Sequence, residues 1–295
     1  MDNKKIYRST SFTEDHKISL NRLLEKLEFP DEVEAVLRRK IPEKSITEIA
    51  ASAYSGENFN FALCRRMPMT RLVVVVFLLL QKYDEYCAKG VSDSVIFDTF
   101  RDVSLRADLY YKKTGKAGIS KEDVIWFRHI MNVNMFKIGA FQFQPFEMIY
   151  LDEETIGEPY MTFGAEQKAS LPSGTPVINI HIQHGASLSP DSVRQSLDSA
   201  LSFFKKHFKE QQFQAFLCYS WLLYPPMTKQ LPCGSNIRQF AERFLIIGCC
   251  NDAAQAKDNL FGDVQEKVKG TMTSLQKLAS AHIEHFGFAC GIIKI

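Results

Sequence analysis

The feature that most constrains the fold of this chain is a close succession of strand and helix patterns between residues 176 and 244. Residues 176–182 alternate apolar and polar side chains, which is the period of a β-strand. A helical pattern follows, and then come a second strand pattern at residues 213–223 and a second helical pattern at residues 236–244. This alternation predicts strands and helices that pack as layers around one sheet.

The first of these helices has a clear beginning in the sequence. Ser189 is a preferred N-cap residue, and Pro190 suits the first helical position, where an N–H group has no partner within the helix. The apolar face of this helix consists of Val193, Leu197, Ala200, Leu201, Phe204 and Phe208. A loop of small residues between a strand and a capped helix binds anions, because backbone N–H groups and the helix dipole point at the ligand. We therefore expect the chemistry of the chain at this loop.

The composition excludes several classes of protein. Of the 295 residues, 45% are hydrophobic and 24% are charged, as in soluble globular proteins. A net charge of +2 and the lack of a dense Lys and Arg block argue against a nucleic-acid partner. The most apolar run, residues 72–80, is shorter than the ~20 residues that cross a bilayer and predicts a buried helix, so no membrane partner is expected.

The N-terminal sequence MDNKKIYRST lacks the apolar core of a signal peptide. The seven cysteines are scattered and odd in number, which favours reduced thiols over a disulfide framework. Both observations indicate a cytoplasmic protein.

The chain divides into two parts of different character. Helical spacing dominates the first part: Leu20, Leu23, Leu24 and Leu27 share one face, residues 70–88 form a long apolar helix, and residues 92–111 suggest two more helices. The GKAG segment at residues 115–118 breaks this pattern, which predicts a helical domain of residues 1–120 and a second domain of residues 121–295.

The second part mixes strands with helices, so the predicted fold class is α+β. Strand patterns occur at residues 140–150, 245–250 and 287–295, and one or two helices are expected within residues 262–286. Pro145 lies inside the first of these strands and suggests an edge position or a bulge, because proline lacks the N–H group of the ladder.

The order of these elements is similar to the core of the GNAT acyltransferases. Local segments resemble one bacterial branch more closely, in which an acyltransferase N-terminal helical domain precedes a GNAT-like C-terminal domain. The segments that carry the resemblance are FDTFRDVSLRADLYYKKTGKAGI (97–119), FKIGAFQF (136–143), HIQHGASL (181–188), SWLLYPPM (220–227), SNIRQFAERF (235–244) and TSLQKLASAHIEHFG (273–287). The resemblance implies a mixed β-sheet flanked by helices after the helical domain.

The resemblance also implies an acyl-CoA co-substrate, such as acetyl-CoA, at the loop after residue 181. Typical GNAT proteins carry Gln/Arg-x-x-Gly-x-Gly/Ala there, and this chain has Gln183-His184-Gly185-Ala186, with one glycine at a shorter spacing. The residues expected to bind the cofactor are Ile182, Gln183, Gly185, Ala186, Ser187, Ser189, Asn236 and Arg238. Helix capping is the simpler interpretation of Asn236, and a solvated side chain is the simpler interpretation of Arg238.

Acyl transfer from a thioester to an amine requires a polarised carbonyl, a base for the amine and an acid for the departing thiolate. The main chain around His181 and Ile182 is the candidate for the first role. His181 suits the role of general base, because histidine titrates near neutral pH. A hydrogen-bonded interior histidine is the simpler interpretation of the same residue.

Three further side chains are candidate catalytic groups. Tyr224 would be the acid, a role that tyrosine often fills in the GNAT proteins that this chain resembles; otherwise it anchors the following Pro-Pro turn. Ser220 would hold a substrate or make a local turn contact, and Glu147 would accept a proton or only face solvent.

No metal is expected. The sequence has no Cys-x-x-Cys or His-Glu-x-x-His motif, and His282 and His285 lack obvious partners.

The preferred function is therefore transfer of an acyl group, such as acetyl, from CoA to an unidentified amine by direct attack. The alternative is a non-catalytic ligand-binding or regulatory protein with a degenerate acyltransferase fold, so the assignment as an enzyme stays open. An enzyme should show a gap between the strands that begin at Pro176 and Phe213. A binding protein should show that gap filled by side chains such as Trp221, or a pocket elsewhere.

Overall fold

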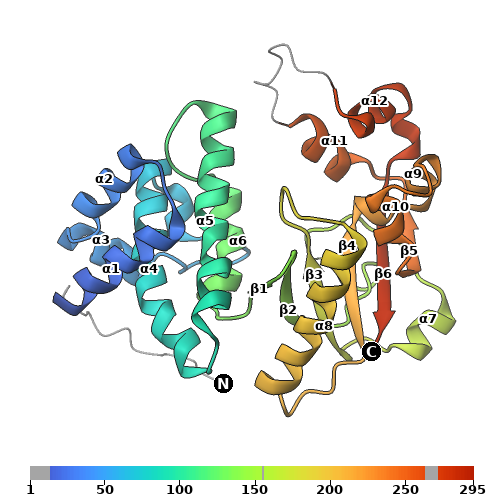
Figure 1. Cartoon of the computed structure of the whole chain (residues 1–295), viewed down its shortest axis with the longest axis horizontal. Coiled ribbons are helices and arrows are strands. Elements are labelled where there is room, and N and C mark those ends of the chain that lie inside the picture. Colours follow the sequence, from blue (N-terminus) through green and yellow to red (C-terminus); the bar gives the residue numbers. More distant parts are fainter. Residues whose placement is uncertain (1–13, 155, 263–271) are drawn as a thin grey trace. The chain divides into compact units, whose positions relative to one another are not determined.

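The computed structural model describes residues 14–154, 156–262 and 272–295, and the chain forms two compact units that divide between Phe136 and Lys137. The first unit is helical (Figure 1). Its helices are α1 (Glu14–Leu27), α2 (Asp31–Lys40), α3 (Lys44–Ala51), the 3-10 helix η1 (Ala62–Arg65), α4 (Pro68–Ala88), α5 (Asp93–Thr114) and α6 (Lys121–Met131).

The core of the helical unit follows the apolar pattern of the sequence. The four leucines Leu20, Leu23, Leu24 and Leu27 are all buried on α1, and residues 71–80 of α4 are buried throughout. None of the described helices has the length and apolar character needed to span a membrane. Where two helices were expected at residues 92–111, α5 is one continuous helix that ends at Gly115, which adopts φ +66°. Glycine is favoured at such a left-handed C-terminal position.

The helix α6 belongs to the helical unit, so the division of the chain lies later than the expected boundary at residue 120. A capping box begins α6: Ser120 Oγ accepts a hydrogen bond from the Asp123 N–H at 3.0 Å, and the Asp123 carboxylate accepts one from the Ser120 N–H at 2.9 Å. The Trp126 indole N–H donates to Asp102 on α5 at 2.7 Å, and Arg106 bridges Asp102 and Asp123, each at 3.2 Å. These contacts hold α6 against α5.

The second unit is built on a mixed six-stranded sheet in the order β1-β2-β3-β4-β6-β5, which confirms the α+β fold class. The strands are β1 (Phe136–Ile138), β2 (Phe141–Glu147), β3 (Pro176–His181), β4 (Ala215–Ser220), β5 (Leu245–Cys250) and β6 (Phe288–Lys294). The helices are α7 (Ala165–Ser170), α8 (Pro190–His207), η2 (Trp221–Leu223), α9 (Pro225–Gln230), α10 (Asn236–Ala241), α11 (Ala254–Phe261), α12 (Ser274–Ala281) and η4 (Ile283–His285).

Pro145 lies within β2, between β1 and β3 in the sheet. The neighbouring β1 has only three residues, so it is too short to pair with the whole of β2. Part of the expected helical region at residues 262–286 falls outside the described residues, because residues 263–271 are not described.

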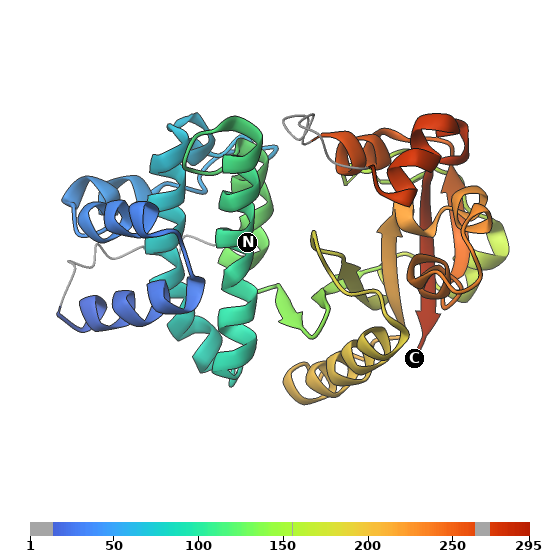
Figure 2. The same ribbon diagram turned by 45° about the horizontal axis from the view of Figure 1, so that its top comes forward.

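The two faces of the sheet are covered differently. On one face, Phe141 contacts Phe240 of α10 and Phe143 contacts Phe216 of β4, with ring centroids 5.5 Å and 6.0 Å apart. The other face packs against residues 148–171, through a core that includes Tyr150, Met161, Val177, Leu217 and Ile292. In Figure 1 and Figure 2, α8 runs along the sheet, and α9 to α12 gather where β6 begins, away from the C-terminus.

Candidate active site

Two neighbouring parallel strands separate at the centre of the sheet. The ladder between β3 and β4 pairs Ile178 with Phe216 and Asn179 with Leu217, and it ends there. Meanwhile β3 stays paired with β2 as far as His181, and β4 stays paired with β6 as far as Ser220. Each strand is thus paired with its outer neighbour beyond the point where the inner ladder stops.

The loop after β3 leads within a few residues to the N-terminus of α8. The Ala186 N–H donates to the Gln183 carbonyl at 3.1 Å, and Gly185 adopts φ +75° in this turn. Ser189 is the N-cap of α8 and Pro190 its first residue, as predicted, but the Ser189 side chain makes no capping bond to the helix. Its hydroxyl instead donates to Ser192 Oγ at 2.9 Å.

The N-terminus of α8 can therefore receive an anion. The hydroxyl of Ser187 lies 3.2 Å from that of Ser189 and 3.1 Å from that of Ser192, which gathers three hydroxyl groups beside the first turn. Asp191 is exposed and forms an ion pair with Arg194 at 3.0 Å, which offsets its charge. The dipole of an 18-residue helix adds to the attraction for an anion.

Arg243 is a residue at this site that the sequence analysis missed. Its guanidinium donates to the carbonyl oxygen of Pro190 at 3.4 Å, which brings an exposed cation to the first residue of α8. The two residues are 53 positions apart, so no local pattern could have indicated their approach.

The two cofactor candidates on α10 have other contacts. Arg238 donates to Glu242 at 2.8 Å and to the Leu231 carbonyl at 3.0 Å, and its bond to Glu242 raises its pKa. Asn236 is exposed at the start of α10, and Ser235 precedes it as the N-cap residue. The hydrogen bonds of Arg238 are therefore made within residues 231–242.

His181 lies at the parted end of β3 among three amide side chains. The register pairs Gln142 with His181 and Gln144 with Asn179, so all four share one face of the sheet. The His181 Nε2 atom lies 2.9 Å from Gln144 Oε1 and 3.3 Å from Asn179 Nδ2. The shorter contact favours a proton on Nε2, donated to Gln144, which leaves the lone pair of the ring on Nδ1.

The amides around His181 are deeply buried. The exposed fractions are 0% for Gln142, 3% for Gln144 and 5% for Asn179. Among the described residues, both polar atoms of the Gln142 amide and the Oδ1 atom of Asn179 have no hydrogen-bond partner. Buried polar groups without partners are costly and rare in native proteins, and they are a frequent mark of functional sites.

Glu158 is a second titratable group that the sequence analysis missed. It lies between Ile156 and Met161, which pack against the apolar core of the sheet, and burial raises its pKa to about 7. Burial raises the pKa of Cys218 and of Tyr219, and the charge of Glu158 raises both to a smaller degree. A lone glutamate in an irregular segment gives no sequence signal, because its burial depends on the tertiary fold.

Tyr224 follows η2 and is 8% exposed. Its ring lies beside Gly287, where an added Cβ would come within 2.6 Å of the tyrosine ring. Burial raises the pKa of Tyr224, and the thiols of Cys249 and Cys250 raise it further, so its hydroxyl keeps its proton. The apolar cluster of Tyr224 includes Ile182, the residue that follows His181.

Ser220 and Glu147 occupy different environments. The Ser220 hydroxyl accepts a hydrogen bond from the Leu222 N–H at 3.1 Å and so caps η2, which is the turn contact considered as its alternative role. Glu147 is exposed and pairs with Pro176, at the opposite end of the β2–β3 ladder from His181. Five residues of β-strand separate the two positions by roughly 17 Å. The structure therefore does not bring Glu147 together with His181.

Trp221 does not lie on β4 but in η2, where it packs against Phe286 with ring centroids 6.2 Å apart. A possible metal-ligand set lies nearby in sequence: the ligand atoms of His282, Glu284 and His285 are all within 4.8 Å of one another. Glu284 Oε1 lies 3.1 Å from His282 Nδ1 and 3.9 Å from His285 Nε2. Glu284 is thus the neighbour that the sequence analysis did not assign to the two histidines.

Both units match families of acyltransferase domains. Residues 18–133 match the N-acyltransferase N-terminal domain, and residues 135–292 match the GNAT-like C-terminal domain. None of the curated proteins matches the chain.

Solved structures with a similar fold include an acyltransferase in complex with decanoyl-CoA and teicoplanin, at 18% identity and a TM-score of 0.69, over 93% of this chain and 87% of that chain. A mutant acyltransferase in complex with octanoyl-CoA has 17% identity and a TM-score of 0.69, over 94% of this chain and 88% of that chain. The matched C-terminal family spans more than half of this chain, and the N-terminal family spans most of the remainder. The chain therefore belongs to the family in which an N-acyltransferase N-terminal domain precedes a GNAT-like C-terminal domain, as its sequence predicted.

Proposed function

We propose that this chain is an acyl-CoA-dependent N-acyltransferase that moves an acyl group from CoA to an amine by direct attack. The observation that carries the proposal is the early end of the β3–β4 ladder, directly before the loop that enters α8. Main-chain groups of β3 and β4 beyond the end of their ladder could hydrogen-bond the thioester and the pantetheine arm of CoA. The N-terminus of α8, together with Arg243, could bind the phosphates of CoA. All of these features belong to one strand–loop–helix segment and its immediate neighbours.

In the proposed reaction the amine nitrogen attacks the thioester carbonyl carbon, and His181 Nδ1 takes the proton that the nitrogen loses. Main-chain N–H groups near His181 and Ile182 stabilise the oxyanion. The C–S bond then breaks, and the thiolate takes a proton from the Tyr224 hydroxyl, which burial keeps protonated. The proton on His181 leaves to solvent, and Tyr224 regains one from solvent. Glu158, whose pKa of about 7 suits a base, is the candidate to replace His181 in this role.

The sequence alone suggested acetyl as the acyl group, but the ligands of the structural relatives broaden the choice. Those relatives bind octanoyl-CoA, decanoyl-CoA and teicoplanin. We therefore propose to compare acetyl-, octanoyl- and decanoyl-CoA as donors, with teicoplanin as the first amine acceptor. Products should be identified by mass spectrometry, because Cys87, Cys233 and Cys249 are exposed and would react with a reagent for the thiol of CoA.

Binding is the first experiment. A ligand at ~100 times its dissociation constant adds ~2.7 kcal/mol to the free energy of unfolding. We expect an acyl-CoA and free CoA, but not ATP, to raise the thermal midpoint by several degrees. The variant Arg243→Ala should weaken CoA binding more than Arg238→Ala, since the guanidinium of Arg238 is held by Glu242. No rise with any acyl-CoA at millimolar concentration would favour the non-catalytic alternative.

Catalysis is the second experiment. His181→Ala and Tyr224→Phe should each lower kcat by about two orders of magnitude, which is the usual contribution of an acid or base. The matched control is His207→Ala, a half-buried histidine at the end of α8. Acyl transfer that survives both site variants would contradict the assigned roles while leaving the acyltransferase assignment intact.

A further inference from the structure

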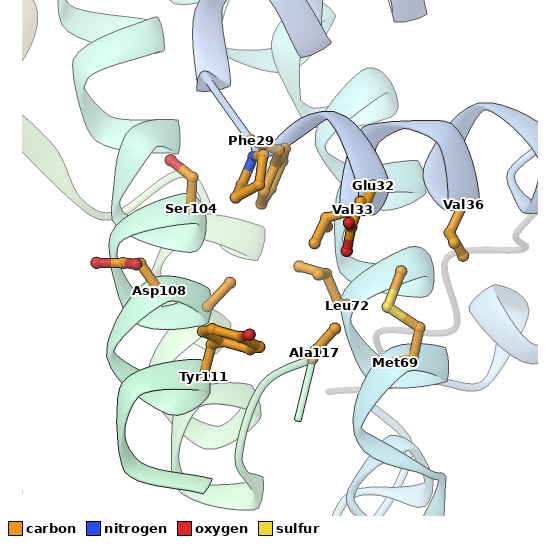
Figure 3. Close-up of a pocket in the computed structure, with 13 residues that line it drawn as sticks. Phe29, Glu32, Val33, Val36, Met69, Leu72, Ser104, Asp108, Tyr111 and Ala117 are labelled. Carbon is orange, nitrogen blue, oxygen red and sulfur yellow. The ribbon is translucent and has the colours of Figure 1, made fainter. Parts of the chain in front are cut away.

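A pocket of about 340 Å³ lies within the helical unit, and none of its lining residues belongs to the unit that carries the proposed acyl-transfer site. Figure 3 shows side chains from α2, α4 and α5 arranged around one space. The floor is apolar and buried, with Phe29 6%, Leu72 0% and Ala107 8% exposed. The ring of Tyr111, which is 57% exposed, forms an open side. A ligand in this space would cover apolar surface that now faces water.

The rim of the pocket carries negative charge. Glu32 is an exposed lining residue in the first turn of α2, and Figure 3 shows its carboxylate on the pocket side of that helix, near Val33. Asp108, the second acid of the lining, is turned away in Figure 3 and forms an ion pair with Lys112 at 2.9 Å. Among the described residues, no lysine or arginine forms an ion pair with Glu32. Within the part of the chain that the structure describes, the rim carboxylate without an ion pair is therefore that of Glu32.

The size of the pocket limits the apolar part of a ligand. An apolar cavity of roughly 150 Å³ holds one benzene molecule. The present volume is about twice as large, and it accepts a flexible alkyl chain of roughly eight to ten carbons. A carboxylate at the rim disfavours an anionic head group and favours a cationic one.

We propose that this pocket is a binding site for an alkylammonium ligand, with the chain between α2, α4 and α5 and the ammonium group at Glu32. The chain supplies most of the affinity, because the floor is apolar and buried. The exposed carboxylate contributes less to the affinity, but it makes the pocket select cationic over anionic amphiphiles. The site does not depend on the proposed acyl transfer.

Calorimetric titration of the full chain with hexyl-, octyl- and decylammonium chloride, below their micelle concentrations, tests the proposal. Each added methylene should tighten the dissociation constant about fourfold until the pocket is full, so octylammonium should bind about fifteen times more tightly than hexylammonium. Octanoate, which has the same chain and the opposite charge, should bind more weakly than octylammonium. Equal affinity for all three chain lengths, or tighter binding of octanoate, would overturn the proposal.

Two variants locate the site. Ala107→Leu fills the pocket from its floor and should weaken octylammonium binding at least tenfold, provided that its thermal unfolding shows a folded protein. Glu32→Gln alters an exposed side chain and should cost less than about 1 kcal/mol of stability, so the protein stays folded. It should weaken octylammonium binding about threefold and leave octanol binding unchanged. The matched control Glu25→Gln removes an exposed carboxylate of α1 that does not line the pocket, and it should change neither. If Glu32→Gln and Glu25→Gln behave alike, the proposal fails even when Ala107→Leu does not fold.

Discussion

At the residue scale, the pair of His181 and Gln144 is the most testable part of the site. Gln144 Oε1 lies 2.9 Å from His181 Nε2, so Gln144→Glu would place a carboxylate against the imidazole. A carboxylate stabilises the imidazolium form, which cannot act as a base. We expect the pH at which acyl transfer is half-maximal to rise by about one unit, measured from kcat/KM against pH.

The control for this prediction is Gln144→Leu, which removes the hydrogen bond without adding charge. It should lower kcat by loss of orientation and leave the half-maximal pH near that of the natural chain. An unchanged pH profile in Gln144→Glu would mean that His181 is not the base, and Glu158 would then take its place in the mechanism.

Glu158 leads to a prediction about stability. Burial raises its pKa from 4.5 to about 7, so between these values the folded carboxyl keeps a proton that the unfolded chain has lost. The free energy of unfolding must then fall as the pH rises through this window, by roughly 3 kcal/mol when the carboxyl is fully ionised. Glu158→Gln should remove this decrease, as measured by urea unfolding at pH 5 and pH 8. The control variant Glu147→Gln removes an exposed carboxyl group and should show the same decrease in the free energy of unfolding as the natural chain. If Glu158→Gln also loses this stability between pH 5 and pH 8, the argument from burial is refuted.

At the element scale, the sequence predicts best what depends on neighbouring residues. The alternation of β3, the Ser189–Pro190 start of α8 and the leucine face of α1 were all predicted and all appear. The interruption expected within α5 does not, because Ile96, Phe100, Val103 and Ala107 form one continuous buried face along it. The position at which the β3–β4 ladder ends, after Asn179, could not be predicted, because no local pattern sets how far two strands stay paired. The same holds for the approach of Arg243 to α8.

The turn between β1 and β2 shows how packing adds to backbone strain. Gly139 adopts φ +60°, and a Cβ there would overlap the hydroxyl of Ser196 on α8, which accepts a hydrogen bond from the Ala140 N–H at 2.7 Å. Gly174, at φ +81° in the same unit, has nothing within 4 Å of such a Cβ. Gly174→Ala should therefore cost about 1 kcal/mol for the backbone alone, and Gly139→Ala about 2 kcal/mol or more, by urea unfolding. Equal losses would show that α8 yields to the added methyl group.

At the scale of the whole molecule, two units with separate cores and separate proposed ligands predict two unfolding transitions. Each unit contains one tryptophan, Trp126 in the helical unit and Trp221 in the sheet unit. The variant Trp221→Phe keeps only Trp126, so its fluorescence reports unfolding of the helical unit. The variant Trp126→Phe keeps only Trp221 and reports unfolding of the sheet unit. Octylammonium should raise only the transition that Trp126 reports, and acyl-CoA only the one that Trp221 reports, since each ligand stabilises the unit that binds it.

The destabilising substitution Gly139→Ala assigns the transitions independently, because it should lower only the one that Trp221 reports. A single transition that both ligands shift equally would mean that the units unfold as one cooperative body. In that case the helical unit would owe part of its stability to the sheet unit, and acyl-CoA binding would also stabilise the alkylammonium pocket. Two transitions with one ligand each would instead establish two independent binding sites in one chain.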